Sequence, residues 1–121
     1  MKIYLAGPWA QRDAMRKARE KIHITSSHVV YSRWLDLVVT NKPGEQAMEA
    51  QHDIEDLNEA SALVVMNLEK SEGKAFEQGY MFGQHKPVIV VGAKTHVFQY
   101  HPNITVVDTL DDALLVLDRL Q

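Results

Sequence analysis

The spacing of hydrophobic residues alternates along the chain between the period of a strand and that of a helix. Short apolar runs rich in β-branched residues occupy Lys2–Ala6, His28–Ser32, Ala62–Leu68, Val88–Gly92 and Ile104–Asp108. Each run predicts a β-strand. The third run is almost entirely apolar, which is typical of a strand covered on both faces.

Helical spacing fills the intervals between these strands. We predict helices after the first strand, over residues 45–60, from about residue 74 to 85, and after a capping box formed by Thr109 and Asp112. The apolar stripes expected to face the core are Ala10, Ala14, Ala18 and Ile22; Ala47, Ala50, Ile54 and Leu57; and Leu110, Ala113, Leu114 and Leu117. In the third helix, a stripe of small residues, Ala75, Gly79 and Gly83, predicts close packing against a neighbour. Residues 33–44 are expected to form a long connection.

Strands that alternate with helices predict an α/β fold with a parallel sheet between two helical layers. The 121 residues suffice for one domain, spanning 1–121. For five strands we expect the doubly wound, flavodoxin-like or Rossmann-like order 2-1-3-4-5, with the ligand at the carboxyl ends of strands one and three. Those ends lead into Gly7-Pro8-Trp9 and Ser71-Glu72-Gly73, so the chemistry is expected there.

Composition narrows the range of functions. The net charge of −3 argues against a nucleic-acid polymer as partner, although a small anionic ligand remains compatible with it. The chain contains no cysteine, and its six histidines show no metal-ligand spacing, so we expect no metal site. Glycine-rich dinucleotide and triphosphate motifs are missing, and we expect no cofactor. With neither a signal-peptide pattern nor a membrane-length apolar run, the chain is interpreted as cytoplasmic.

Two carboxylates stand out as candidate catalytic groups. Glu77 follows the third strand early in a helix, where the helix dipole favours its ionised, nucleophilic form. Asp53 lies at the border of an apolar helical stripe, from which it could face a cleft. A solvated helix charge is the more common role for each residue. Tyr4 could donate its hydroxyl to a carboxylate or be satisfied in the core, which is the default.

Several motifs occur together in an order that resembles one enzyme family. They are Lys2-Ile3-Tyr4-Leu5-Ala6-Gly7-Pro8, Asp53 shortly before the third strand, Gly73-x-x-x-Glu77-x-Gly79, and Lys86-Pro87-Val88. In this order and spacing, the sequence resembles nucleoside 2-deoxyribosyltransferases, including the related deoxynucleoside 5′-monophosphate N-glycosidases.

The resemblance implies roles for the three candidate residues. Glu77 would be the nucleophile that forms a glycosyl-enzyme intermediate, Asp53 the acid/base that protonates the departing nucleobase, and Tyr4 the partner that positions Glu77. Deoxyribosyl transfer is the first reading. Hydrolysis of a nucleoside monophosphate and a non-catalytic nucleotide-binding module are the alternatives.

The resemblance also implies substrate contacts. Residues of the first loop and Ser71 would contact a 5′-phosphate, and Arg12 could reach it. A turn or cap residue is an equally consistent interpretation of Ser71, and a surface charge of Arg12. Trp9 could stack on the base or cap the cleft, while Trp34 could pack on the second helix. The candidate substrate-binding residues are Gly7, Trp9, Arg12, Ser71 and Gly73. A homodimer or larger homo-oligomer is implied, with the segment Phe98 to His101 of a neighbour closing the pocket, although this segment could equally be an exposed loop.

Overall fold

The computed structural model of the protein, which describes residues 1–38 and 42–121, confirms the predicted architecture. A single parallel sheet has the strand order β2-β1-β3-β4-β5. Its strands are β1 (Lys2–Ala6), β2 (Val29–Val30), β3 (Ala62–Met66), β4 (Val88–Val91) and β5 (Ile104–Val107). The order reverses between β1 and β3, so a crevice opens above the carboxyl ends of these two strands.

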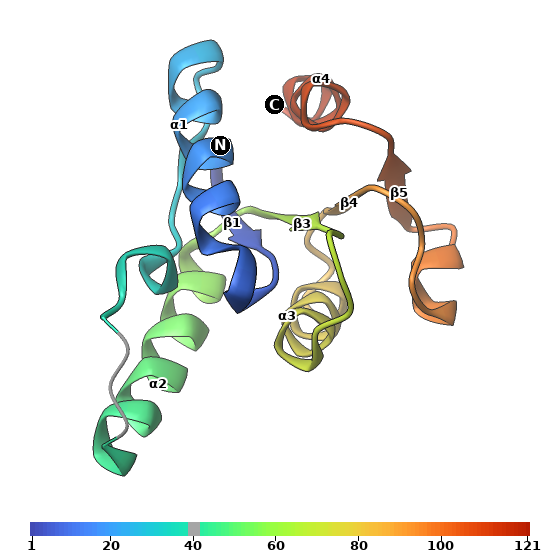
Figure 1. Ribbon diagram of the computed structural model, residues 1–121. Helices are drawn as coiled ribbons and strands as arrows, with labels where there is room; N and C mark the ends of the chain where they lie inside the picture. Colours follow the sequence, from blue (N-terminus) through green and yellow to red (C-terminus); the bar gives the residue numbers. More distant parts are fainter. Residues whose placement is uncertain (39–41) are drawn as a thin grey trace.

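Helices cover both faces of the sheet (Figure 1). The helices are α1 (Arg12–Thr25), α2 (Pro43–Glu59), α3 (Glu72–Gly83) and α4 (Leu110–Leu120), with short 3₁₀ helices η1 (Trp9–Gln11), η2 (Arg33–Asp36) and η3 (Val97–Tyr100). Helices α1 and α4 lie on one face, and α2 and α3 lie on the other. The central strands β1, β3 and β4 are almost wholly buried between these layers.

The core follows the sequence pattern at its centre and departs from it at the ends of two helices. The stripe of α4 is buried as predicted. In α1, by contrast, Met15 takes the core position and Ala14 is exposed, while Ala10 is exposed in η1. The expected stripe of α2 is wrong at Ala47 and Ala50, which are exposed, because the amino-terminal half of this helix extends beyond the sheet (Figure 1).

The expected second strand is shorter in the structure, and the long connection after it contains structure of its own. Beyond Val30, the Ser32 hydroxyl takes the place of the sheet pairing and accepts a hydrogen bond from the Leu5 amide at 2.8 Å. The chain then turns into η2, which lies between α1 and α2. Asn41, part of the predicted break in this connection, lies outside the described residues.

Helix α3 starts two residues earlier than expected, because Ser71 caps it by accepting a hydrogen bond from the Lys74 amide at 3.3 Å. The prediction of close packing along Ala75, Gly79 and Gly83 is wrong. All three residues are exposed, and a methyl group added at either glycine would meet no atom within 4 Å. The smooth stripe therefore belongs to the surface of this protein chain.

Candidate active site

A cavity of about 200 Å³ lies at the carboxyl ends of β1 and β3. It gathers seven of the eight site residues predicted from the sequence: Tyr4, Gly7, Trp9, Asp53, Ser71, Gly73 and Glu77. They come from β1, the loop after it, α2, and both the cap and the second turn of α3. The fold thus brings residues separated by more than seventy positions into one small space.

Arg12 is the predicted residue that the cavity does not include. Its Nη1 donates a hydrogen bond to the Leu37 carbonyl, and its guanidinium lies over the Trp9 ring, 4.1 Å from the centroid. Both contacts direct the side chain toward the outer side of the cavity wall. In this arrangement Arg12 supports residues that line the cavity.

Three buried oxygen atoms around the cavity have no hydrogen-bond partner within the described part of the chain. They are the Tyr4 hydroxyl, Oδ1 of Asp53 and Oε2 of Glu77. Buried polar groups are nearly always hydrogen-bonded in native proteins, and leaving one unpaired costs roughly 1–3 kcal/mol. Three such atoms around one cavity are the pattern expected where a ligand supplies the missing partners.

Burial governs the protonation of the two carboxyl groups. It raises the pKa of Glu77 to about 8, against the opposing effect of the Tyr4 hydroxyl, and the nearby Asp53 raises it further. Burial, followed by the charges of Asp56 and Glu49, raises the pKa of Asp53 to about 6. The expectation that the helix dipole keeps Glu77 ionised is therefore wrong. Glu77 lies in the second turn of α3, where burial outweighs the dipole.

Tyr4 is fully buried and remains a proton donor at every physiological pH. Burial and the neighbouring Glu77 and Asp53 carboxylates raise the pKa of its hydroxyl far above its usual value. A phenol that keeps its proton can donate a hydrogen bond to a carboxylate and stays neutral beside it.

The amino-terminal end of α3 forms a second side of the cavity. Lys74, which sequence reasoning missed, is almost fully buried there, and its Nζ donates to Asn67 Oδ1 at 2.8 Å and to the Glu69 carbonyl. Burial lowers the pKa of Lys74. A lysine in a first helical turn reads as a surface charge, so nothing in its local sequence announces this position. Gly73 is exposed, which leaves the backbone at this end of the helix accessible.

Trp9, Trp34 and Leu37 form the third side, which we call the aromatic wall. The two indole rings lie 6.2 Å apart, and Trp34 Nε1 donates to the Leu5 carbonyl at 2.9 Å. Trp34 and Leu37 belong to the connection after β2, so sequence reasoning did not place them at the site. Gly7 has a packing role here, because a methyl group at this position would lie 2.5 Å from the Met15 side chain.

The fold and the site define a Rossmann-like α/β protein whose pocket is built around two carboxyl groups at the switch point of the sheet. Residues 3–112 match the sequence model of the nucleoside 2-deoxyribosyltransferase family, and the chain belongs to that family. Comparison with curated protein sequences gives no significant match.

Solved structures share this fold. A 2-deoxyribosyltransferase from Bacillus psychrosaccharolyticus has a TM-score of 0.76 at 19% identity, over 93% of this chain and 90% of that chain. A conserved protein from Enterococcus faecalis V583 has a TM-score of 0.75 at 19% identity, over 100% and 99% of the two chains. A CMP N-glycosidase from Clostridium botulinum has a TM-score of 0.61 at 13% identity, over 98% and 99%. The family and two of these structures are enzymes, which supports glycosyl transfer or cleavage as the general activity.

Searches for two other features were negative in the part of the chain that the structure describes. Over residues 1–38 and 42–121, no group of three or more acidic or histidine side chains is arranged to hold a metal ion. Among the helices described above, none has the length and apolar character to cross a membrane.

Proposed function

We propose that this protein cleaves or exchanges the N-glycosidic bond of a deoxynucleoside or nucleotide through a glycosyl intermediate on Glu77, with deoxyribosyl transfer as the first candidate reaction. The observation that carries the proposal is the set of unpartnered oxygens of Tyr4, Asp53 and Glu77 around one cavity. A nucleophile, an acid and a hydroxyl donor are the groups that displacement at an anomeric carbon requires.

In the first step, a Glu77 carboxylate oxygen forms a bond to C1′ of the sugar. The bond from C1′ to the base nitrogen breaks, and its electron pair stays on the base, which takes a proton from Asp53. In the second step, an acceptor base or water attacks C1′ and gives a proton to Asp53. The bond from C1′ to Glu77 breaks, and the carboxylate is restored. Tyr4, whose hydroxyl lies beside Glu77, donates to the Glu77 carboxylate when that group is ionised. No cofactor takes part.

The raised pKa of Glu77 favours the proton on this residue, whereas the first step uses the form with Glu77 ionised and Asp53 protonated. Because the pKa of Glu77 is raised more than that of Asp53, the reactive form is the minority among the singly protonated states. Hydrogen bonds from Tyr4 and from a bound sugar would stabilise charge on Glu77 and offset this preference. The reaction is thus expected to depend on substrate binding to redistribute one proton.

Incubation of the protein with a panel of deoxynucleosides and their 5′-monophosphates, with and without a second free base, tests the proposal. A new nucleoside formed only with the acceptor base supports transfer. Free base released from a donor without an acceptor supports hydrolysis. Tight nucleotide binding without turnover of any donor would replace the proposal by a non-catalytic binding module.

Hydrolysis of a nucleoside 5′-monophosphate is the second candidate. It is favoured by the exposed amino-terminal end of α3, where Ser71 and Gly73 line the cavity beside the cationic Lys74. Backbone amides at a helix start and a nearby cation favour an anionic group. Under this reading, release of base occurs from the monophosphate and not from the matching deoxynucleoside, and inorganic phosphate competes with the donor.

A homodimer or larger homo-oligomer is also proposed. An apolar groove of about 800 Å³ lies beside α3 and shares Ser71 and Lys74 with the cavity. Phe98 lines it with 72% of its surface exposed, as expected for a side chain that a second copy covers. Light scattering on the wild type and on Phe98→Ser tests this, since a monomeric wild type contradicts it. We further propose a cytoplasmic location, which imaging of a tagged protein would test.

A further inference from the structure

We propose that Arg16, together with Arg12 and Arg19, is a positioning residue that fixes the aromatic wall and so sets substrate affinity. The inference rests on the proposed function for its kinetic readout, and it has a second readout that does not. Arg12, Arg16 and Arg19 occur at positions i, i+4 and i+7 of α1, so their side chains leave the helix on one face.

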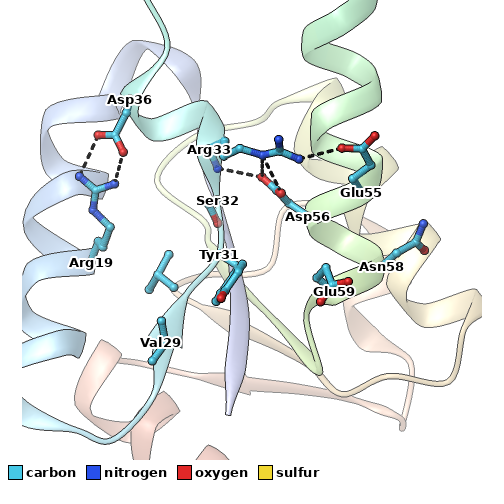
Figure 2. Close-up of a pocket in the computed structure, with 11 residues that line it drawn as sticks. Arg19, Val29, Tyr31, Ser32, Arg33, Asp36, Glu55, Asp56, Asn58 and Glu59 are labelled. Carbon is cyan, nitrogen blue, oxygen red and sulfur yellow. Dashed lines mark hydrogen bonds and ion pairs between the residues drawn. The ribbon is translucent and has the colours of Figure 1, made fainter.

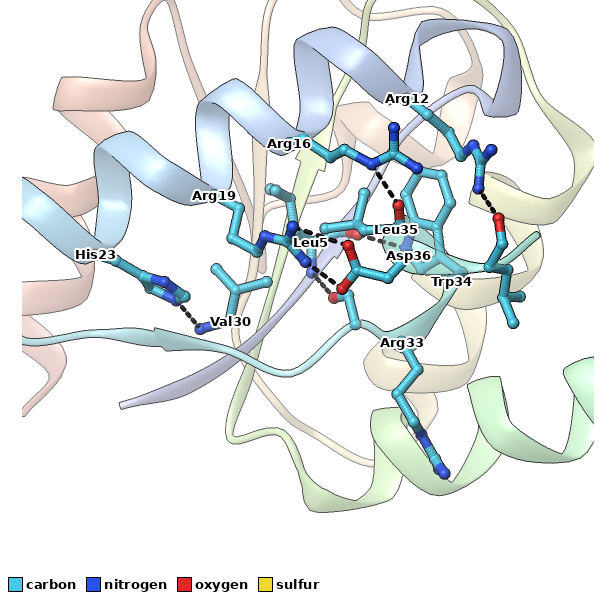
Figure 3. Close-up of polar contacts among 12 residues, drawn as sticks. Leu5, Arg12, Arg16, Arg19, His23, Val30, Arg33, Trp34, Leu35 and Asp36 are labelled. Carbon is cyan, nitrogen blue, oxygen red and sulfur yellow. Dashed lines mark hydrogen bonds and ion pairs between the residues drawn. The ribbon is translucent and has the colours of Figure 1, made fainter.

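The three arginines contact three consecutive residues of the neighbouring segment (Figure 3). Arg16 Nε donates to the Leu35 carbonyl at 2.7 Å. Arg19 holds the Asp36 carboxylate through two hydrogen bonds, at 2.7 and 2.9 Å. Arg12 Nη1 donates to the Leu37 carbonyl. Each arginine therefore contacts a different residue of this stretch.

Two of the three arginines donate to backbone carbonyls and therefore hold the main chain. Leu35 and Leu37 lie at the end of a one-turn helix, where carbonyl groups need donors from outside the helix. A guanidinium is charged at all relevant pH values and supplies several donors in a fixed geometry. Arg16 and Arg12 thus fix the main chain itself on both sides of Asp36, whereas Arg19 holds an exposed side chain.

The opposite side of the same segment is fastened to α2 (Figure 2). The Arg33 amide and Nε each donate to the Asp56 carboxylate at 2.9 Å, and Arg33 Nη2 reaches Glu55 at 3.0 Å. Asp56 is buried, one helical turn from Asp53.

These contacts hold residues 33–37 between α1 and α2, the helix that carries Asp53. Its Trp34 side chain is only 6% exposed and faces the cavity that Asp53 borders. If the arginine contacts are lost, Trp34 and Leu37 move relative to the two carboxyl groups. Asp53 and Glu77 themselves stay in place on α2 and α3. Substrate binding should therefore weaken more than the chemical step.

Steady-state kinetics of Arg16→Met test the role, because methionine keeps most of the aliphatic volume and removes the donor to Leu35. We expect KM to rise about tenfold, with kcat within about twofold of wild type, which corresponds to about 1.4 kcal/mol of lost affinity. Lys17→Met is the matched control, since it removes the same charge from an exposed neighbour on α1. Asp13→Asn removes the 3.1 Å surface ion pair of Arg16 and spares its bond to Leu35. Both controls should keep the wild-type KM.

Tryptophan emission provides the readout that needs no turnover. In a Trp9→Phe background Trp34 is the single tryptophan, and Arg16→Met should shift its emission to longer wavelength and increase its quenching by acrylamide. If Arg16→Met does not fold, Arg16→Lys, which keeps the charge, is measured in the same two ways. Unchanged KM and emission in the folded variant would overturn the proposal, as would a fall in kcat with KM unchanged. A wild type inactive on every donor contradicts the proposed function instead, and the emission shift alone then decides the role of Arg16.

Discussion

Two sides of the cavity differ in whether their polar atoms have hydrogen-bond partners. On the aromatic wall, the Trp34 indole N–H is bonded to Leu5, and the main chain behind it is held by Arg12 and Arg16. On the side formed by Tyr4, Asp53 and Glu77, which we call the carboxylate wall, each residue has a buried oxygen without a partner in the described structure.

The difference separates what supports the fold from what a ligand completes. Satisfied polar groups on the aromatic wall stabilise one position of the chain. Unsatisfied oxygens on the carboxylate wall cost stability, which is characteristic of groups retained for binding or catalysis. Substitutions on the carboxylate wall should therefore remove activity and leave stability unchanged or higher. Those behind the aromatic wall should mainly change affinity.

The largest effect is expected for Glu77→Ala, which should abolish turnover of every donor because the covalent intermediate cannot form. Circular dichroism and thermal unfolding should show an intact fold, and Glu72→Ala, an exposed carboxylate on the same helix, serves as control. Mass spectrometry after reaction with a 2-fluoro-substituted donor should find the added sugar on the peptide containing Glu77. A label on Asp53 would reverse the two assignments, and full activity of Glu77→Ala would exclude the covalent mechanism.

Asp53→Asn should lower kcat by about a hundredfold or more, because the departing base no longer receives a proton. The loss should shrink for donors whose base leaves easily without protonation. A series of donors with different base pKa values measures this dependence. An equal loss for all donors would mean that Asp53 acts on the fold or on binding.

Glu77→Gln should stabilise the protein in a pH-dependent way. Burial raises the folded-state pKa of Glu77 from 4.5 to about 8, so between these values the folded state binds more protons than the unfolded state. The stability of the wild type consequently falls as pH rises through this window, and the variant lacks this contribution. Urea unfolding gives the free energy of unfolding of Glu77→Gln relative to wild type. This difference should be roughly 2–4 kcal/mol larger at pH 8.5 than at pH 5. A gain independent of pH would contradict the raised pKa.

Tyr4→Phe should be milder, lowering kcat about tenfold, because it removes one donor near Glu77 and keeps the packing of the ring. Without this donor the charged form of Glu77 is less stable, so the pKa of Glu77 should rise further. The alkaline limb of the pH–rate profile, expected near pH 8 in the wild type, should move upward. An alkaline limb that does not move would mean that the Tyr4 hydroxyl does not donate to Glu77.

The smallest effect is predicted for Asp56→Asn, which keeps an acceptor for the Arg33 amide and removes one charge near Asp53. The profile of kcat/KM against pH should be bell-shaped, with its acidic limb near pH 6. Since the charge of Asp56 is the largest charge effect that raises the pKa of Asp53, this limb should move to lower pH. Movement of the alkaline limb alone would contradict the assignment.

Much of the fold could be predicted because its signals are local. The apolar run Ala62–Leu68 and the turn residues after β1 are enough to predict a central strand and the place of the ligand crevice. Helix ends were harder to predict, because the cap at Ser71 depends on side-chain geometry. The connection after β2 could not be predicted, because η2 is held by Arg16 and Asp56, from helices on either side of it.

The sequence by itself determined the alternation of strands and helices and led to the expected strand order, whereas the grouping of Tyr4, Asp53 and Glu77 was implied only by the resemblance to the family. The alternation and the strand order follow from periodicity and from the chain reversal at the switch point, which short stretches of residues encode. Only the tertiary structure decided that Glu77 is buried enough to hold a proton, that Lys74 lies inside, and that Arg12 supports the aromatic wall. Burial and hydrogen-bond partners come from residues far apart along the chain, and so do the charge states that burial imposes.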